Sequence, residues 1–189
     1  MILYINACVR SASRTKLLAD HLLSKFEGDI REVRLADVKF ADVDEAYLAK
    51  RDRLAAAKDH SADMFSLARD FAAADEIIIA APFWDLSFPA SLKQYFEHIN
   101  VIGLTFDYND KGEPVGLCAA KKLYYVTTAG GKIFNEEYGF GYVRALAETF
   151  YGISNCVMFK AEGLDIYGAD TAAILEKAKS EIDEHTGHN

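Results

Sequence analysis

Short apolar runs alternate along the chain with longer segments in which apolar residues recur every three or four positions. The runs are rich in Ile, Val, Leu and Tyr, which is typical of strands buried on both faces of a sheet. They predict strands at 2–6, 30–35, 76–81, 122–127 and 155–161. The second run alternates between apolar and charged residues, which indicates a strand at or near an edge of the sheet.

The segments with helical spacing lie between and after these strands. They predict a first helix after Thr15, with Leu18, Leu22 and Phe26 on one face, and further helices at 64–73, 89–99, 142–151 and 171–184. Because strands and helices alternate, we expect one α/β domain over residues 1–189. Its form is a three-layer sandwich around a five-stranded parallel sheet in the order 2-1-3-4-5. Residues 101–116 are expected to form a β-hairpin insertion. Segment 36–63 is expected to be a partly helical excursion, and segment 132–141 a loop.

Three turns that follow the first, third and fourth strands carry the candidate chemistry. The first turn, R-S-A-S-R-T, holds the hydroxyls of Ser11, Ser13 and Thr15 and the charges of Arg10 and Arg14. The start of a helix presents unpaired N–H groups and the positive end of the helix dipole, so this loop suits a phosphate. An ordinary N-cap needs only one hydroxyl. The excess of hydroxyls and arginines favours an anion site.

The second turn, A-P-F-W-D-L-S-F-P, is unusually apolar. Pro82 ends the strand, and Phe83, Trp84 and Leu86 surround a single acid, Asp85. A large apolar loop at the carboxyl end of a buried strand is typical of ligand binding in open α/β sheets. The same side chains could instead pack the following helix onto the sheet, and the loop alone does not decide between the two.

The third turn, T-A-G-G, consists of Thr128, Ala129, Gly130 and Gly131. Paired glycines after a strand let the backbone approach a ligand closely, although a plain turn has the same composition. In the expected strand order the three turns lie along one edge of the sheet. An anion cradle, an apolar shelf and a glycine turn match the phosphate, the flat ring and the polar ring edge of a mononucleotide such as FMN.

Composition excludes several other functions. The net charge of −8 argues against a protein that binds nucleic acid or a membrane surface over a broad face. No apolar run approaches the length of a membrane span and no signal peptide is evident, so we expect a cytoplasmic protein. The cysteines, Cys8, Cys118 and Cys156, show no zinc-ligand spacing, and no metal site is expected. His185 and His188 are expected in a frayed polar tail.

Several segments resemble the flavodoxin-like, FMN-dependent NAD(P)H oxidoreductases of the azoreductase and quinone reductase group. They are R-S-A-S-R-T, P-F-W-D-L-S-F-P-A-S-L-K-Q-Y-F, G-L-T-F-D-Y, T-T-A-G-G, and F-Y-G-I-S followed by A-E-G. They occur in the family's order and cover nearly the whole chain. The resemblance implies a flavodoxin-like fold, FMN as cofactor and NADH or NADPH as co-substrate. It also implies a quinone, azo or nitroaromatic acceptor and a homodimer with active sites at the subunit interface.

The resemblance also implies which residues hold FMN. The phosphate would be bound by the first turn, the isoalloxazine ring would be bordered by the second, and its pyrimidine edge and ribityl chain would be held by the third. The residues concerned are Ser11, Ser13, Arg14, Thr15, Pro82, Phe83, Trp84, Asp85, Leu86, Thr128, Ala129, Gly130 and Gly131. Two features depart from the family. The first turn is shorter than in many azoreductases, and Asp85 stands where they usually carry Asn, although an ionised Asp cannot donate a hydrogen bond to the flavin.

The implied reaction is a ping-pong cycle, in which hydride passes from NAD(P)H to flavin N5 and an electron acceptor is then reduced. Such a cycle requires the protein to supply position and hydrogen-bond donors rather than a proton carrier. No side chain is therefore predicted as a general acid or base, and Asp85 and Trp84 are expected only to border the flavin.

Two other functions remain open. Cys8 and Arg14 have the C-x5-R spacing that resembles low-molecular-weight tyrosine phosphatases, in which a thiolate attacks phosphate. However, that loop contains no glycine, and the reading leaves the second and third turns without a role. A buried structural cysteine is the simpler interpretation of Cys8. The acidic chain could also be a non-catalytic electron carrier of flavodoxin type, which the hairpin insertion and the excursion do not favour.

Overall fold

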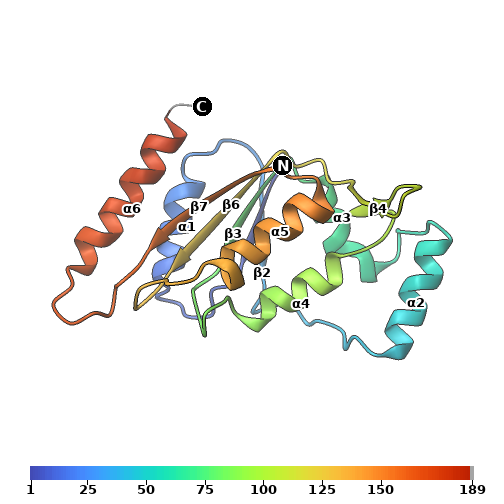
Figure 1. Ribbon diagram of the computed structural model, residues 1–189, viewed down its shortest axis with the longest axis horizontal. Coiled ribbons are helices and arrows are strands. Elements are labelled where there is room, and N and C mark those ends of the chain that lie inside the picture. The colour runs from blue at the N-terminus through green and yellow to red at the C-terminus, as the bar shows by residue number, and fades with distance from the viewer. Residues whose placement is uncertain (188–189) are drawn as a thin grey trace.

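The computed structural model describes residues 1–187, in which a central parallel sheet carries helices on both faces (Figure 1). The strands of the sheet are β1 (Ile2–Asn6), β2 (Ile30–Arg34), β3 (Glu76–Ala80), β6 (Lys122–Thr128) and β7 (Asn155–Ala161). A separate hairpin consists of β4 (Phe106–Tyr108) and β5 (Pro114–Gly116). The α-helices are α1 (Arg14–Leu23), α2 (Glu45–Ala56), α3 (Ser66–Ala73), α4 (Ala90–Ile99), α5 (Tyr142–Leu146) and α6 (Thr171–Thr186).

The order of the sheet is β2-β1-β3-β6-β7, and all neighbouring strands are parallel. Once the hairpin strands are set aside, this is the predicted order 2-1-3-4-5, so both the fold class and the hairpin insertion are confirmed. The same order places β2 at an edge of the sheet, which confirms the prediction of an edge or near-edge strand, and Val33 is the one buried residue of β2. Parallel pairing brings the carboxyl ends of β1, β3 and β6 to one edge of the sheet.

Two apolar cores lie on opposite faces of the sheet. Ile78 packs with Leu18 of α1 and Ile182 of α6, whereas the next residue, Ile79, packs with Phe96 of α4 and the helices beside it. Both isoleucines have no exposed surface. Because successive side chains of a strand point to opposite faces, a sheet covered on both sides requires an unbroken apolar run. The unbroken apolar run at 76–81 therefore indicates a sheet with helices on both faces.

Helix α2 occupies the predicted excursion and lies away from the sheet, at the end of the molecule opposite α6 (Figure 1). Asp44 caps it, because its Oδ1 accepts a hydrogen bond of 2.8 Å from the N–H of Tyr47. Leu54 is its one buried residue. The weak apolar periodicity of the excursion corresponds to this slight burial.

Two sequence-based expectations were wrong. Segment 132–141 is not a loop throughout, because Glu137–Gly141 forms a π-helical turn that leads without a break into α5 and a second such turn, Ala147–Tyr151. Glycines disfavour helix, so local propensity hid this turn. His185 is not in a frayed tail, because it lies in the last turn of α6 with its ring 5.5 Å from that of Phe159. His188 lies outside the described residues.

Within residues 1–187, no helix combines the length and the apolar character needed to cross a bilayer. The same part of the chain contains no group of three or more His, Cys, Asp or Glu side chains placed to hold a metal ion.

Candidate functional site

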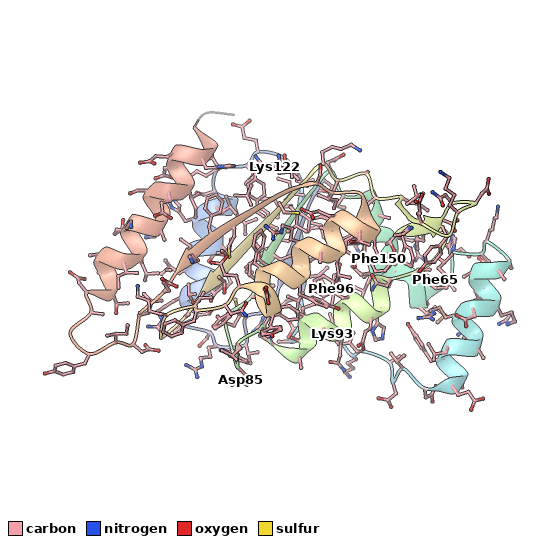
Figure 2. The ribbon with its side chains drawn as sticks, in the orientation of Figure 1. Phe65, Asp85, Lys93, Phe96, Lys122 and Phe150 are labelled. Atoms are coloured by element: carbon pink, nitrogen blue, oxygen red, sulfur yellow. The ribbon has the colours of Figure 1, made fainter. Side chains whose placement is uncertain are left out.

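A cavity of about 250 Å³ lies at the carboxyl edge of the sheet, where the three turns meet. Figure 2 places Asp85, from the turn after β3, at this end of the sheet, and Lys122, the first residue of β6, at the opposite end. The lining residues come from all three turns and from the loop after β7. They are Val9, Arg10, Ala12, Ser13, Arg14, Thr15, Pro82, Phe83, Trp84, Thr128, Gly130 and Asp165.

The first turn presents the start of α1 to this cavity. Ser13 is the N-cap, and its Oγ accepts a hydrogen bond of 3.2 Å from the N–H of Lys16. The first intrahelical bond runs from the N–H of Leu17 to the carbonyl of Ser13. The N–H groups of Arg14 and Thr15 therefore have no carbonyl one turn earlier to bind. These donors and the positive end of the helix dipole suit an anion.

The hydroxyls of Thr15 and Thr128 join the first turn to the third. Their Oγ1 atoms lie 2.6 Å apart, and both residues are buried. One hydroxyl must donate to the other, which leaves the proton of the second hydroxyl for another acceptor. The pair fixes the start of α1 against the end of β6 and keeps one donor at the wall of the cavity.

The second turn is a tight hairpin rather than an irregular loop. The backbones of Trp84 and Ser87 exchange two hydrogen bonds, of 2.9 and 2.7 Å. Between them Asp85 and Leu86 have φ angles of +50° and +67°. Two successive positive φ values define a type I′ turn, which Leu adopts only at a cost in free energy. The turn holds the Trp84 ring, 39% exposed, beside Phe83 at the mouth of the cavity.

The third turn lies against the side chain of Asp165, from the loop after β7. A Cβ atom at Gly130 would lie 2.2 Å from Oδ2 of Asp165, so any side chain there would force the Asp165 carboxylate to move. Gly131 has open space around the corresponding position. Within the described residues, neither the Gly130 nor the Gly131 N–H donates a hydrogen bond, so both remain for a ligand. The sequence argument expected these glycines to let the backbone approach a ligand closely, and it did not anticipate that Asp165 lies against Gly130.

Asp165 is the functional candidate that sequence reasoning missed. It forms an ion pair with Arg14, with Nη1–Oδ1 and Nη2–Oδ2 distances of 2.8 and 3.2 Å. This pair, together with the more distant charge of Arg10, holds the pKa of Asp165 below its usual range. One feature of the sequence could have pointed to Asp165: it closely follows the A-E-G segment at the carboxyl end of the fifth strand, where loops of such sheets commonly face a ligand.

The structure brings together eight of the residues proposed for the cofactor. They line the cavity and are Ser13, Arg14, Thr15, Pro82, Phe83, Trp84, Thr128 and Gly130. Five others do not line it. Ser11 is exposed, Asp85 and Leu86 form the exposed tip of the hairpin, Ala129 is buried with its N–H bound to the carbonyl of Ala161, and Gly131 is exposed.

Cys8 has the properties of a structural residue rather than a nucleophile. It is 2% exposed and absent from the lining of the cavity. Burial raises the pKa of its thiol, and a hydrogen bond from Ser13 and the charge of Lys16 oppose this only in part. A nucleophilic cysteine needs the opposite shift, toward thiolate. The structure therefore does not favour a phosphatase.

Comparison with known proteins agrees with this geometry. A family model described as a flavodoxin-like fold matches residues 1–186. FMN-dependent NADH:quinone oxidoreductase 2 of Clostridium acetobutylicum is 35% identical, over 97% of this chain and 98% of that protein. This chain belongs to the same flavodoxin-like family. An FMN-dependent NADH:quinone oxidoreductase of Lachnoclostridium phytofermentans is 33% identical, over 94% of this chain and 93% of its own length.

Solved structures share the fold of this chain. The azoreductase from Bacillus anthracis str. Sterne aligns with a TM-score of 0.86 at 21% identity, over 100% of this chain and 99% of that one. An FMN-dependent NADH-azoreductase from Bacillus anthracis str. Ames Ancestor, in complex with FMN, aligns with a TM-score of 0.82 at 22% identity, over 99% and 97%. The resemblance found in the sequence is confirmed.

Proposed function

We propose that this member of the family is an FMN-dependent oxidoreductase that takes electrons from NADH and passes them to a quinone or an azo compound. The observation that carries the proposal is the meeting of three separate turns at one cavity, with an anion cradle at one wall and an aromatic surface at another. The names of the relatives supply the cofactor and the substrate classes.

The donor set of the cavity fits FMN. The N–H groups at the start of α1, the Ser13 hydroxyl and the Arg14 guanidinium would bind the phosphate. Phe83 and Trp84 would flank the ring, and the N–H groups of Gly130 and Gly131 would donate to its polar edge. Bound there, FMN would supply the hydride-transfer chemistry.

The protein's own contribution would be position and hydrogen bonding. Donors fixed before the reaction stabilise negative charge without the cost of reorienting during it. The Thr15–Thr128 pair and the Trp84–Ser87 hairpin hold their backbones by hydrogen bonds that exist without a ligand. Hydride transfer through the flavin would require no acid or base in the lining, and Asp165 would serve there as the ion-pair partner of Arg14.

Exposed aromatic side chains beside the site support a homodimer. Phe134 is 91% exposed and Tyr138 is 58% exposed. The carbonyl of Tyr138 accepts a hydrogen bond from the hydroxyl of Ser87, in the Trp84–Ser87 turn at the cavity. Tyr167, two residues after Asp165, is fully exposed. A second copy covering these rings would bury apolar surface and narrow the opening of the site. Sedimentation of the purified protein at several concentrations tests this point.

An anaerobic titration tests the main proposal. The protein is loaded with FMN, NADH is added, and the flavin absorbance near 450 nm is followed before and after a quinone is supplied. We expect bleaching by NADH alone and recovery with the quinone. FMN that binds but is not reduced by NADH would make the protein an electron carrier, and failure to bind FMN would refute the proposal. Hydrolysis of p-nitrophenyl phosphate that is lost in Cys8→Ala would instead support the phosphatase.

A further inference from the structure

Asp165 is a charged side chain in the lining of the cavity to which the family resemblance assigned no role. Its carboxylate accepts hydrogen bonds from Nη1 and Nη2 of Arg14, and Nη1 also donates to the carbonyl of Leu164 at 3.3 Å. The two partners belong to elements that are far apart in the chain, the first turn of α1 and the loop after β7. Asp165 therefore determines where the Arg14 guanidinium lies at the start of α1.

The contacts of Arg14 leave one edge of its guanidinium free. A guanidinium carries five N–H bonds in one plane. Three of them are used, two on Nη1 and one on Nη2. The remaining two, on Nε and Nη2, have no acceptor among residues 1–187 and lie side by side on the other edge. Two parallel N–H bonds of this kind match two oxygens of a phosphate.

The ion pair is poorly explained by stability. The Arg14 and Asp165 side chains are 35% and 66% exposed, and an ion pair this exposed to solvent contributes little to the free energy of folding. Yet the fold makes specific room for it, since a Cβ at Gly130 would collide with the carboxylate. The N–H of Asp165 also binds the carbonyl of Gly130 at 2.9 Å. The backbone of Asp165 is thus held by Gly130, and its side chain is held by Arg14.

We propose that Asp165 is a positioning residue for the flavin phosphate: it holds Arg14 so that the Nε–Nη2 edge of the guanidinium faces the anion cradle at the start of α1. This inference rests on the proposed function, because it concerns the phosphate of the same cofactor. The competing account is electrostatic. A carboxylate near a phosphate repels it, so if Asp165 only contributed charge, its removal would strengthen FMN binding.

The two accounts predict opposite signs for Asp165→Asn. The dissociation constants of FMN and riboflavin, which differ only in the phosphate, are measured by flavin fluorescence with the apoprotein. We expect FMN binding to weaken roughly fivefold or more, because a misplaced charge-assisted donor is lost, and riboflavin binding to stay unchanged. Asp183→Asn is the matched control, because Asp183 also pairs with two basic side chains, Lys25 and His21, but does not line the cavity.

A double-mutant cycle shows whether Asp165 acts through Arg14. In an Arg14→Ala background, Asp165→Asn is expected to have no further effect on FMN binding. Arg14→Lys, which keeps the charge but loses the second edge, is expected to resemble Asp165→Asn. Tighter FMN binding in Asp165→Asn, an equal loss for riboflavin, or an effect that persists without Arg14 would overturn the inference. If the wild-type protein bound neither flavin, the proposed function itself would fail.

Discussion

At the scale of single residues, Leu86 is the most unusual feature of the site. Its φ of +67° places a γ-branched side chain in the left-handed region, which is unfavourable for residues other than Gly and, to a lesser degree, Asn or Asp. The preceding Asp85 tolerates its own positive φ better, because Asp often adopts this region. Strain of this kind persists where a function requires the conformation. Leu86 forms the apolar tip beside Trp84, at the edge of the proposed flavin site.

We expect Leu86→Gly to stabilise the apoprotein while weakening flavin binding. The free energy gained by relieving the left-handed strain should exceed the extra entropic cost of ordering glycine on folding. The net effect should be an increase of about 0.5–1 kcal/mol in the free energy of unfolding. Loss of the apolar tip should raise the dissociation constant of riboflavin and FMN alike. Chemical denaturation and flavin titration measure the two effects. Leu17→Gly, in an exposed helical position, is the control and should only destabilise.

Single residues also show the limit of sequence reasoning. Phe83, Trp84 and the start of α1 could be identified because each belongs to a short contiguous pattern next to a predicted strand. Asp165 could not be paired with Arg14, because 151 positions separate them and neither position has a spacing rule that refers to the other. The collision between a Cβ at position 130 and the Asp165 carboxylate depends on a tertiary contact of the same kind.

At the scale of elements, the join between α1 and β6 depends on the Thr15–Thr128 hydroxyl pair. Both hydroxyls lie in the interior, with residue exposures of 1% and 7%, so either becomes unsatisfied when its partner is removed. A buried polar group without a partner costs about 1–3 kcal/mol, whereas removing both partners together costs much less. The pair therefore couples the phosphate end of the site to the turn that approaches the ring.

A double-mutant cycle at this join has a definite expected outcome. Thr128→Val should lower the free energy of unfolding by about 1–2 kcal/mol, and Thr15→Val by a similar amount. The double variant should lose less than the sum of the two. Urea unfolding of the apoprotein measures all four proteins, and Thr149→Val, at an exposed position, should be nearly neutral. Strict additivity would show that the two hydroxyls do not depend on each other.

Elements also differ in how well their patterns predicted them. Four of the sheet strands were identified because their runs are largely apolar on both faces, and the edge strand β2 because its apolar and charged residues alternate. The π-helical turn Glu137–Gly141 was missed because Gly139 and Gly141 weaken any helical pattern. The turn closes through its own hydrogen bond from Gly141 N–H to the carbonyl of Glu136, at 2.8 Å, and the carbonyl of Tyr138 within it accepts a hydrogen bond from the hydroxyl of Ser87, far away in the chain. Tertiary packing decided what propensity could not.

At the scale of the whole molecule, the strand order was predictable because few arrangements satisfy right-handed crossovers between parallel strands. Once that order is fixed, the carboxyl ends of β1, β3 and β6 meet, and the location of the site follows. The position of α2, outside the sandwich, did not follow from any such rule. Because α2 buries only one residue, its sequence carries little apolar periodicity from which its position could be predicted.

Global unfolding should also become easier at alkaline pH through Cys118. Its side chain is buried in the core on the α4 face of the sheet, and this burial raises the pKa of its thiol to about 12. The unfolded chain loses this proton from about pH 9 upward, whereas the folded protein retains it. The stability that the buried neutral thiol contributes is therefore complete below pH 9 and is lost as the pH rises toward 12.

The fall in unfolding free energy between pH 8 and pH 10 should be smaller in Cys118→Ala than in the wild type, by about 1–2 kcal/mol. Denaturation in the presence of a reductant measures the free energy for both proteins at both pH values. Ile153→Val, which removes one methylene from the same core, should lower the free energy equally at the two pH values. The comparison between variants cancels the tyrosines and lysines that titrate in the same range. An identical pH dependence in Cys118→Ala and the wild type would mean that this thiol is hydrated in the native state.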